Sequence, residues 1–453
     1  MEVNEVSDDS VGPNNRRKKK KRRKEEKANI VNFERSDNFD NFVNFKEKEE
    51  TSLTSKKNMP EKKKHSAIMS YLLLFVREFR RMASRPVYWF VIVFAPLFSF
   101  FFFLTLMGNG LPEDLPVGLV DLDNTATTRS IVRNLDAFQQ SKITAKYANV
   151  TDARRAMQRG EIYAFFYIPK GTTHKANRQE QPTISLYINY SYLIAGSLTY
   201  RDMRTMAELA SGAAARKVLL AKGATESQAM AFLQPIVIDT HAISNPWLNY
   251  NVYLSNTLLP GLLVLCVSLL TAYGIGTEIK DGTAREWLST ANGSIKRAVF
   301  VKFVPQFIVF ALVGAILILL LYGYLRFPCH CGIPTMLLAM LLLILAGQGL
   351  GLFFFAIFPS LRMSMSMTAL WGVLSFSTCG MSFPVLAMHP AIQGLTWFFP
   401  LRHYFLIYVN SALNGFPLQY AWTNVICLLA FAMLPLLLMP RLKHNVLTYD
   451  YAP

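Results

Sequence analysis

The sequence lacks every short motif that would mark it as a nucleotide-consuming or hydrolytic enzyme. It contains no G-x-x-x-x-G-K-[ST] loop, whose backbone amides hold nucleotide phosphates, and neither H-E-x-x-H nor G-x-S-x-G. Asp121 and Asp123 could suggest a metal or acid pair, but a strand end and a turn cap explain them better. The sequence therefore predicts a protein that is not an enzyme.

Cysteine is scarce as well. Of the five cysteines, Cys266, Cys379 and Cys427 fall within apolar runs, where a free cysteine acts as a small core residue. Cys329 and Cys331 flank one histidine in a short loop, and two thiols with one imidazole make an incomplete metal ligand set. A disulfide between residues two apart would be strained. We therefore expect no metal site.

Charge is almost absent from six long apolar runs, and the chain is 52% hydrophobic. Each run reaches the roughly 20 residues that a helix needs to cross the hydrocarbon core of a membrane. We take them as six transmembrane helices, at residues 86–107, 256–276, 300–325, 334–358, 365–388 and 420–439.

Lys302 is the one ionisable residue in these runs, at an end from which its side chain can snorkel to water. A secondary transporter that couples to protons or sodium generally needs ionisable groups within its spans. Neither ion coupling nor ATP hydrolysis is encoded, so the energy for any transport must come from a partner.

Basic residues near the spans fall mainly on one side, which is typical of the cytoplasmic side of a membrane protein. This side carries Arg77, Arg80, Arg81, Arg85, Lys280, Arg285, Lys296, Arg297, Lys302, Arg362, Arg441 and Lys443. The short loops of the opposite side hold only Arg326 and Arg402. Both termini are therefore predicted to be cytoplasmic. Topology largely explains the net charge of +17, and we expect no nucleic-acid partner.

The chain begins with a segment that is too polar to fold. Residues 1–65 contain RRKKKKRRK and other charge runs, which predict a disordered basic tail. Translation that starts at Met59 or Met69 rather than Met1 would remove it. Residues 66–85 place apolar side chains on one helical face and arginines on the other, which predicts a cytoplasmic helix at the membrane interface. Its apolar run is too long for a cleavable signal peptide.

Residues 108–255 alternate between strand and helix patterns. Predicted strands lie at 115–123, 143–150, 161–169 and 182–190, with helices at 125–137, 151–160, 195–221 and 225–233. The predicted fold class is a membrane all-α six-helix transmembrane domain with an inserted extracytoplasmic α/β domain.

The polar connection at 277–299 carries more pattern than a turn needs. Its central stretch reads EIKDGTAREWLSTANGS, in which Thr283 and Glu286 match the T-x-x-E capping box. Four apolar residues follow at helical spacing: Ala284, Trp287, Leu288 and Ala291. The pattern predicts a short helix with one apolar face, which could dock on a partner or lie on lipid headgroups.

Two further groups of residues are candidate sites. Gly347, Gln348 and Gly351 form a G-x-x-x-G pattern with a buried amide, which favours close helix packing over a place on a substrate path. Prolines at positions 384, 390 and 400 interrupt the helical pattern, which predicts a re-entrant extracytoplasmic segment at 389–419. Residues 440–453, after the last span, are predicted to be a cytoplasmic tail. The candidate outer gate or interfacial anchor consists of Phe383, Pro384, Pro400, Arg402, His403 and Tyr404.

Several stretches resemble the ABC-2 type permeases, the membrane subunits of ATP-binding-cassette exporters. Residues that match the family motif between its second and third spans are Glu278, Gly282, Thr283, Glu286, Leu288 and Thr290, once one residue after Glu286 is skipped. GMSFPVLAMHPAIQGLTWFFPLRHYFLIYVNSALNG is similar to the family's fifth-span signature, and VGLVDLDNT and GEIYAFFYIP resemble the subgroup with a large extracytoplasmic domain. The resemblance covers residues 69–443.

The resemblance implies that the short helix is a coupling helix that rests on a cytoplasmic ABC ATPase, with Trp287 and Leu288 as its anchors. ATP and Mg²⁺ would be bound by that subunit. It also implies a second permease copy or paralogue, a periplasmic membrane-fusion adaptor, and outward transport of drugs, lipids or lipid-linked molecules across the inner (plasma) membrane. The alternative is a non-transporting receptor or sensor whose extracytoplasmic domain binds a ligand.

Overall fold

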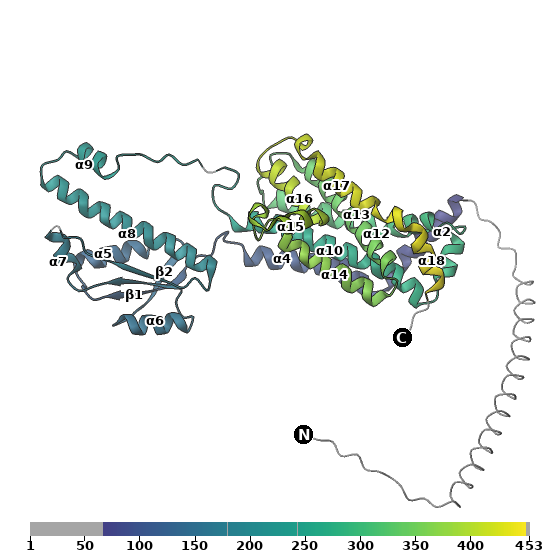
Figure 1. Cartoon of the computed structure of the whole chain (residues 1–453), viewed down its shortest axis with the longest axis horizontal. Helices are drawn as coiled ribbons and strands as arrows, with labels where there is room; N and C mark the ends of the chain where they lie inside the picture. The colour runs from purple at the N-terminus through teal and green to yellow at the C-terminus, as the bar shows by residue number, and fades with distance from the viewer. Residues whose placement is uncertain (1–66, 179, 242, 450–453) are drawn as a thin grey trace, which may run out of the picture. The chain divides into compact units, whose positions relative to one another are not determined.

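The computed structural model describes residues 67–178, 180–241 and 243–449 (Figure 1). The tail predicted at 1–65, with the possible start at Met59, lies outside the described residues. Within them, a mixed sheet with covering helices lies in the sequence between the first long apolar helix and the others.

The sheet contains four strands in the order β2-β1-β3-β4. The strands are β1 (Leu115–Asp121), β2 (Ser141–Lys146), β3 (Ala164–Ile168) and β4 (Ser185–Ile188). β1 pairs in parallel with β2 and β3, while β4 runs antiparallel to β3. The four strands fall where the sequence predicts them.

Helices cover both faces of this sheet: α5 (Ala126–Leu135) and α8 (Leu193–Ala221) lie on one face and α6 (Val150–Gln158) on the other. The same region contains α7 (Thr172–Asn177) and α9 (Glu226–Leu233), of which α9 packs against α8. Alternate residues of β1 point to opposite faces. Leu119 packs in a cluster with residues of α5 and α8, and Val120 packs in another with residues of α6. The result is three layers, helix–sheet–helix.

Asp121 and Asp123 have the structural roles that the sequence favours. Asp121 accepts hydrogen bonds from the amides of Asp123 and Asn124, which closes the turn after β1. Asp123 accepts hydrogen bonds from the amides of Gly171 and Thr173 and so caps α7.

Five helical segments among the described residues are long and apolar enough to cross a membrane: Pro86–Leu106, Tyr250–Lys280, Ile295–Tyr324, Ile333–Ile357 and Leu418–Thr448. The first is built from α3 (Pro86–Trp89), η1 (Phe90–Phe94) and α4 (Ala95–Leu106). The second is α10 (Tyr250–Lys280), the third α12 (Ile295–Ile318) with η2 (Leu319–Tyr324), and the fourth α13 (Ile333–Ile357). The fifth joins η6 (Leu418–Ala421), α17 (Trp422–Met433), η7 (Leu434–Leu438) and α18 (Met439–Thr448).

The predicted span at 365–388 differs from these five. Its helix, α14 (Leu361–Thr378), carries several serines and threonines and is followed by a turn at Gly380, whose φ is +102°. Short elements then follow: η3 (Val385–Ala387), α15 (Pro390–Leu395), η4 (Thr396–Phe398), α16 (Pro400–Ile407) and η5 (Tyr408–Leu413). A sixth span therefore stays a prediction.

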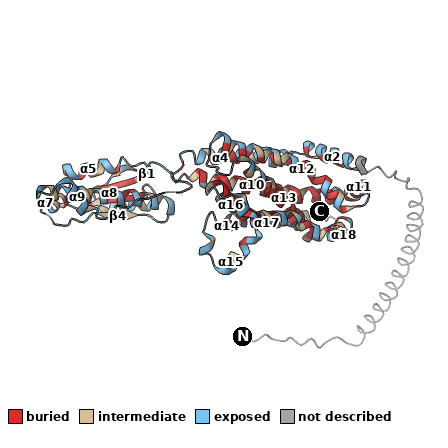
Figure 2. Ribbon diagram, turned by 90° about the horizontal axis from the view of Figure 1, so that it is seen from above, coloured by how far each residue is buried: buried red, intermediate tan, exposed pale blue. Residues whose placement is uncertain are grey.

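α10 and α13 form the centre of the bundle (Figure 2). In the most apolar stretch of each, 72% of the residues are buried, against 17% for Pro86–Leu106. Two shorter helices lie next to the long ones in the sequence: α2 (Ala67–Ser84) before the first and α11 (Ala284–Thr290) between α10 and α12. In this bundle, movement of α10 must also displace α13.

Candidate functional site

The chain leaves α10 through a sharp turn that requires glycine. Gly282 has φ +68°, which residues with a Cβ rarely adopt. Its amide donates to the carbonyl of Ile279, and the amide of Thr283 donates to the carbonyl of Glu278. This pair of hydrogen bonds is the Schellman motif, which ends a helix by satisfying its last carbonyls. The turn fixes the direction in which α11 begins.

α11 exists where the sequence predicts a short helix, but the capping-box prediction is wrong. Thr283 is the N-cap residue, yet its side chain makes no capping hydrogen bond. Its hydroxyl instead donates to Oε2 of Glu278. Glu286 is exposed, and its backbone carbonyl accepts hydrogen bonds from the hydroxyls of Ser289 and Thr290. The Thr283 hydroxyl is therefore bonded to the Glu278 carboxylate instead of capping α11.

The apolar face of α11 packs against the chain itself. Trp287 is 0% exposed and Leu288 6% exposed. Both belong to a cluster that includes residues of α2, α10, α12, α13 and α18. The expectation that Trp287 and Leu288 are the anchoring surface for a partner is therefore wrong, because neither side chain is accessible. The exposed edge of α11 instead carries Arg285 and Glu286.

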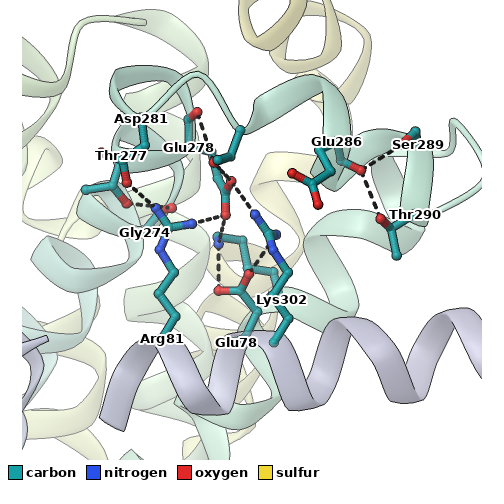
Figure 3. A network of polar contacts seen from close by, with 12 residues as sticks. Glu78, Arg81, Gly274, Thr277, Glu278, Asp281, Glu286, Ser289, Thr290 and Lys302 are labelled. Carbon is teal, nitrogen blue, oxygen red and sulfur yellow. Dashed lines mark hydrogen bonds and ion pairs between the residues drawn. The ribbon is translucent and has the colours of Figure 1, made fainter. Parts of the chain in front are cut away.

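A buried cluster of charges joins α2, α10 and α12 (Figure 3). Glu278 is completely buried in the last turn of α10. Its carboxylate accepts from Nζ of Lys302 at 2.8 Å, from Arg77 at 2.9 Å and from Arg81. Lys302 also donates to Oε2 of Glu78 at 2.7 Å. Two carboxylates thus share one ammonium group, and the guanidinium groups of α2 complete the compensation.

Lys302 does not reach water, contrary to the snorkelling that the sequence suggests. Its side chain is 2% exposed and is held between Glu78 and Glu278. Its Nζ also lies 5.4 Å from the centre of the Trp287 ring, within the range of a cation–π interaction. Lys302 therefore links the charge cluster to the buried face of α11.

A second ion-pair group extends the cluster to the surface. Asp281 follows α10 and pairs with Arg81 at 2.9 Å and with Arg85. Sequence reasoning missed Glu78 and Asp281 and assigned Arg77, Arg81 and Arg85 only to topology. The available signal was Glu78 itself, an acid in an otherwise basic, amphipathic helix.

The glycine pattern of α13 lies where two helices pack closely. A Cβ on Gly347 would lie 2.6 Å from Cγ2 of Val264, and a Cβ on Gly351 would lie 2.4 Å from the carbonyl oxygen of Ser268, both in α10. Gln348 is 7% exposed, and its Nε2 donates to the carbonyl of Phe303 at 3.1 Å. These residues therefore join α13 to α10 and α12.

The candidate outer residues do not form one site. Phe383 and Pro384 are exposed, whereas Pro400, His403 and Tyr404 are buried in α16. His403 lies 3.1 Å from Oδ1 of Asn424 and 3.0 Å from the carbonyl oxygen of Trp397. The Tyr404 hydroxyl and Nε of the partly exposed Arg402 are buried, and neither has a hydrogen-bond partner among the described residues. His403 thus fastens α16 to α17, while the exposed pair lies outside that contact.

Comparison with protein families decides the class of this molecule. A model for the ABC-2 family transporter proteins matches residues 86–439, which is most of the chain. The chain belongs to the ABC-2 transporter family. No individual curated protein matches this ABC-2 permease. Among the described residues there is no group of three or more His, Cys, Asp or Glu side chains that could hold a metal ion.

Membership of the family gives the charge cluster a context. An ABC-2 permease is a multi-pass membrane component of a transporter, and the family as a whole works with an ATPase. In this ABC-2 permease, the match begins at Pro86 and therefore includes α10, α11 and α12 but not α2. The buried acid Glu78 and its neighbouring arginines thus lie just before the matched region.

Proposed function

We propose that this ABC-2 permease is the membrane subunit of an exporter and that a separate cytoplasmic ATPase moves it by binding the exposed edge of α11. The observation that carries the proposal is the double attachment of α11. Thr283 bonds to Glu278 at one end, and Trp287 is buried under Lys302 in the middle. A short helix fixed in this way transmits a displacement instead of absorbing it.

The surface available to the ATPase has mixed charge. Arg285 and Glu286 are exposed on α11, and Asn292 and Gly293 are exposed in the turn that follows. Rim charges of this kind set partner specificity and the rate of association. Force applied here reaches α10 through the Schellman turn and α12 through Lys302. Because α10 packs on α13, the movement spreads to the centre of the bundle.

The lining of the bundle supports our proposal for the substrate class. Between α4, α10 and α12 lies a cavity of about 250 Å³ whose lining is apolar except for Ser99. Such walls suit hydrophobic or amphipathic compounds such as drugs, lipids or lipid-linked molecules. We further propose that two permease copies or paralogues form the path in the plasma membrane, with termini in the cytoplasm, and that the sheet region engages a periplasmic adaptor.

Charge reversal at Arg285 tests the docking surface. The tagged chain is purified from its native cells, and the ATPase that accompanies it is identified and quantified. Arg285→Glu should lower its recovery at least about tenfold, the effect of removing a contact worth about 1.4 kcal/mol. Arg133→Glu, the same change at an exposed position of α5, should leave the recovery unchanged. Equal recovery with both variants would show that α11 is not the docking surface.

The same preparation separates transport from sensing. A receptor would recover a kinase or regulator in place of a P-loop ATPase. Uphill movement of a compound by the purified chain alone in vesicles, on an ion gradient, would contradict the proposed dependence on an ATPase. Removal of residues 113–240 with retention of the bundle tests the adaptor: normal adaptor recovery would rule out that role for the sheet region.

A further inference from the structure

A hollow lined by arginines lies between α2 and the turn that follows α10. Its volume is about 510 Å³, within the range of small-molecule sites. Arg77, Arg80, Arg81 and Arg85 line it, and Asp281 forms part of the opposite wall. Four guanidinium groups around one hollow indicate an anionic ligand, because each presents a planar set of N–H donors that matches phosphate or carboxylate.

The acids of the protein do not neutralise this surface. The four arginines and Lys302 face three carboxylates, those of Glu78, Glu278 and Asp281, which leaves an excess of two positive charges. Arg80 is exposed, and its side chain has no ion pair or hydrogen bond to any described residue. The donors of Arg80 are therefore available on the side of the hollow.

The same hollow has an apolar end. Leu73 and Val76 line it and are 44% and 56% exposed, although both are large apolar side chains. The opposite face of α2 is covered, since Leu74 is 0% exposed and Met82 8% exposed. Apolar residues one to two turns before a group of arginines place a hydrocarbon surface beside a cationic one. A free anion would gain nothing from the apolar end, whereas an amphiphile would use both.

We propose that this hollow binds the phosphate of an anionic phospholipid in the cytoplasmic leaflet, with the start of its acyl chain along Leu73 and Val76. Anionic lipids are concentrated in that leaflet and attract basic residues next to a membrane span. α2 directly precedes the first span, so its arginines lie at headgroup depth. The bound phosphate offsets the excess charge and holds α2 against the end of α10. The proposal does not depend on an ATPase partner.

Native mass spectrometry of the full-length chain in detergent tests the site. The protein is titrated with phosphatidylglycerol and, separately, with phosphatidylcholine of the same acyl chains, and the first lipid adduct is counted. Phosphatidylglycerol should bind at least about fivefold more tightly, because one basic residue at a membrane surface contributes about that factor. Arg80→Gln should remove about the same factor. Arg80 is exposed, so this substitution leaves the buried ion pairs intact.

Arg362→Gln is the matched control, since it removes one exposed cation at the start of α14 outside the hollow. It should leave the phosphatidylglycerol affinity unchanged. Arg80→Lys should restore only part of the affinity, because lysine keeps the charge but not the planar donor set. Equal losses for Arg80→Gln and Arg362→Gln, or equal binding of the two lipids, would overturn the site. Competition by millimolar inorganic phosphate or glycerol phosphate would show a soluble anion site instead of a lipid site.

Discussion

Lys302 and Glu78 form an ion pair in which both side chains are almost fully removed from solvent. Nζ lies 2.7 Å from Oε2, and the two side chains are 2% and 3% exposed. Glu278, 0% exposed, shares the same ammonium group. Burial of three charges is costly, and their mutual attraction offsets that cost only while the set is complete. The ion pair thereby fixes α2 to α12.

Replacement of Lys302 by methionine should strongly destabilise the bundle. The change leaves Glu78 and Glu278 buried without their shared cation, which costs about 3–5 kcal/mol. Thermal unfolding of the detergent-purified chain measures the effect. Lys296→Met, at an exposed position in the first turn of the same helix, should change little. The double variant Lys302→Met with Glu78→Gln should recover part of the lost stability. If Lys302→Met alone were as stable as Lys296→Met, the buried ion pairs would not stabilise the bundle.

Alanine at Gly349 should disrupt the contact between α13 and α17. A Cβ there would lie 2.1 Å from the carbonyl oxygen of Phe431, a backbone atom that cannot rotate away. Overpacking of this kind costs about 1–3 kcal/mol. Gly212→Ala in α8 is the control, because its Cβ would meet no atom within 4 Å. That control should stabilise the helix by about 0.5–1 kcal/mol, so melting temperatures that shift in the same direction would contradict the packing.

Cys331 should react with alkylating reagents at neutral pH. It lies in the loop before α13, outside the candidate spans, and its Sγ is 3.8 Å from Sγ of Cys329. A hydrogen bond from the Cys329 thiol lowers the pKa of Cys331 to about 7, and the same contact raises the pKa of Cys329. Because the pKa is lowered, the reactive thiolate accumulates as the pH rises through about 7.

Iodoacetamide labelling followed by peptide mass spectrometry gives the rate at each cysteine. Cys329→Ala removes the hydrogen-bond donor. The pH at which the labelling rate of Cys331 is half-maximal should then rise toward about 8.5, the usual cysteine pKa. Cys331→Ser identifies the labelled site. An unchanged midpoint in Cys329→Ala would mean that the neighbouring thiol has no influence on Cys331.

Asp123→Asn should loosen α7. Asp123 accepts hydrogen bonds from the amides of Gly171 and Thr173. Its pKa is lowered mainly by a hydrogen bond with the side chain of Thr173, and the two amides lower it further. Loss of a helix cap costs about 0.5–2 kcal/mol. Because the pKa is lower in the folded state, this stabilisation is present above the ordinary aspartate pKa and is lost as the pH falls below it.

Hydrogen–deuterium exchange of residues 170–177 in the full chain measures the opening of α7. Asp114→Asn is the control, since Asp114 is 70% exposed and makes only a surface ion pair with Lys142. Faster exchange confined to Asp123→Asn is expected. Equal protection in the two variants would show that the carboxylate does not hold the helix.

The strands and most helices could be predicted because their signals are local. Thr125 and Thr225 cap α5 and α9 at the positions where the sequence predicts those helices to begin, and the four strands lie in the predicted segments. The parallel pairing of β1 with β2 and β3 has no such signal, since pairing joins distant residues. The span predicted at 365–388 stays a prediction, because its helix α14 ends at Thr378, before the turn at Gly380.

The candidate site was predicted only as far as periodicity could define it. Spacing identified the apolar face of α11 but could not say whether that face meets a partner or its own chain, and the chain covers Trp287 completely. The capping box failed because Glu278, brought near by the Schellman turn, competes for Thr283. Glu78 was missed because its partner Lys302 follows 224 residues later.

That separation in sequence has a consequence for biogenesis. Glu78 is synthesised long before Lys302, so in the nascent chain it has Arg77 beside it but lacks its buried ammonium partner until the third long apolar helix has been made. Until then, the contact between α2 and α12 cannot form. The late lysine thus completes the buried charge cluster last, because a polypeptide truncated before it keeps Glu78 and Glu278 with only the arginines of α2 as counter-ions.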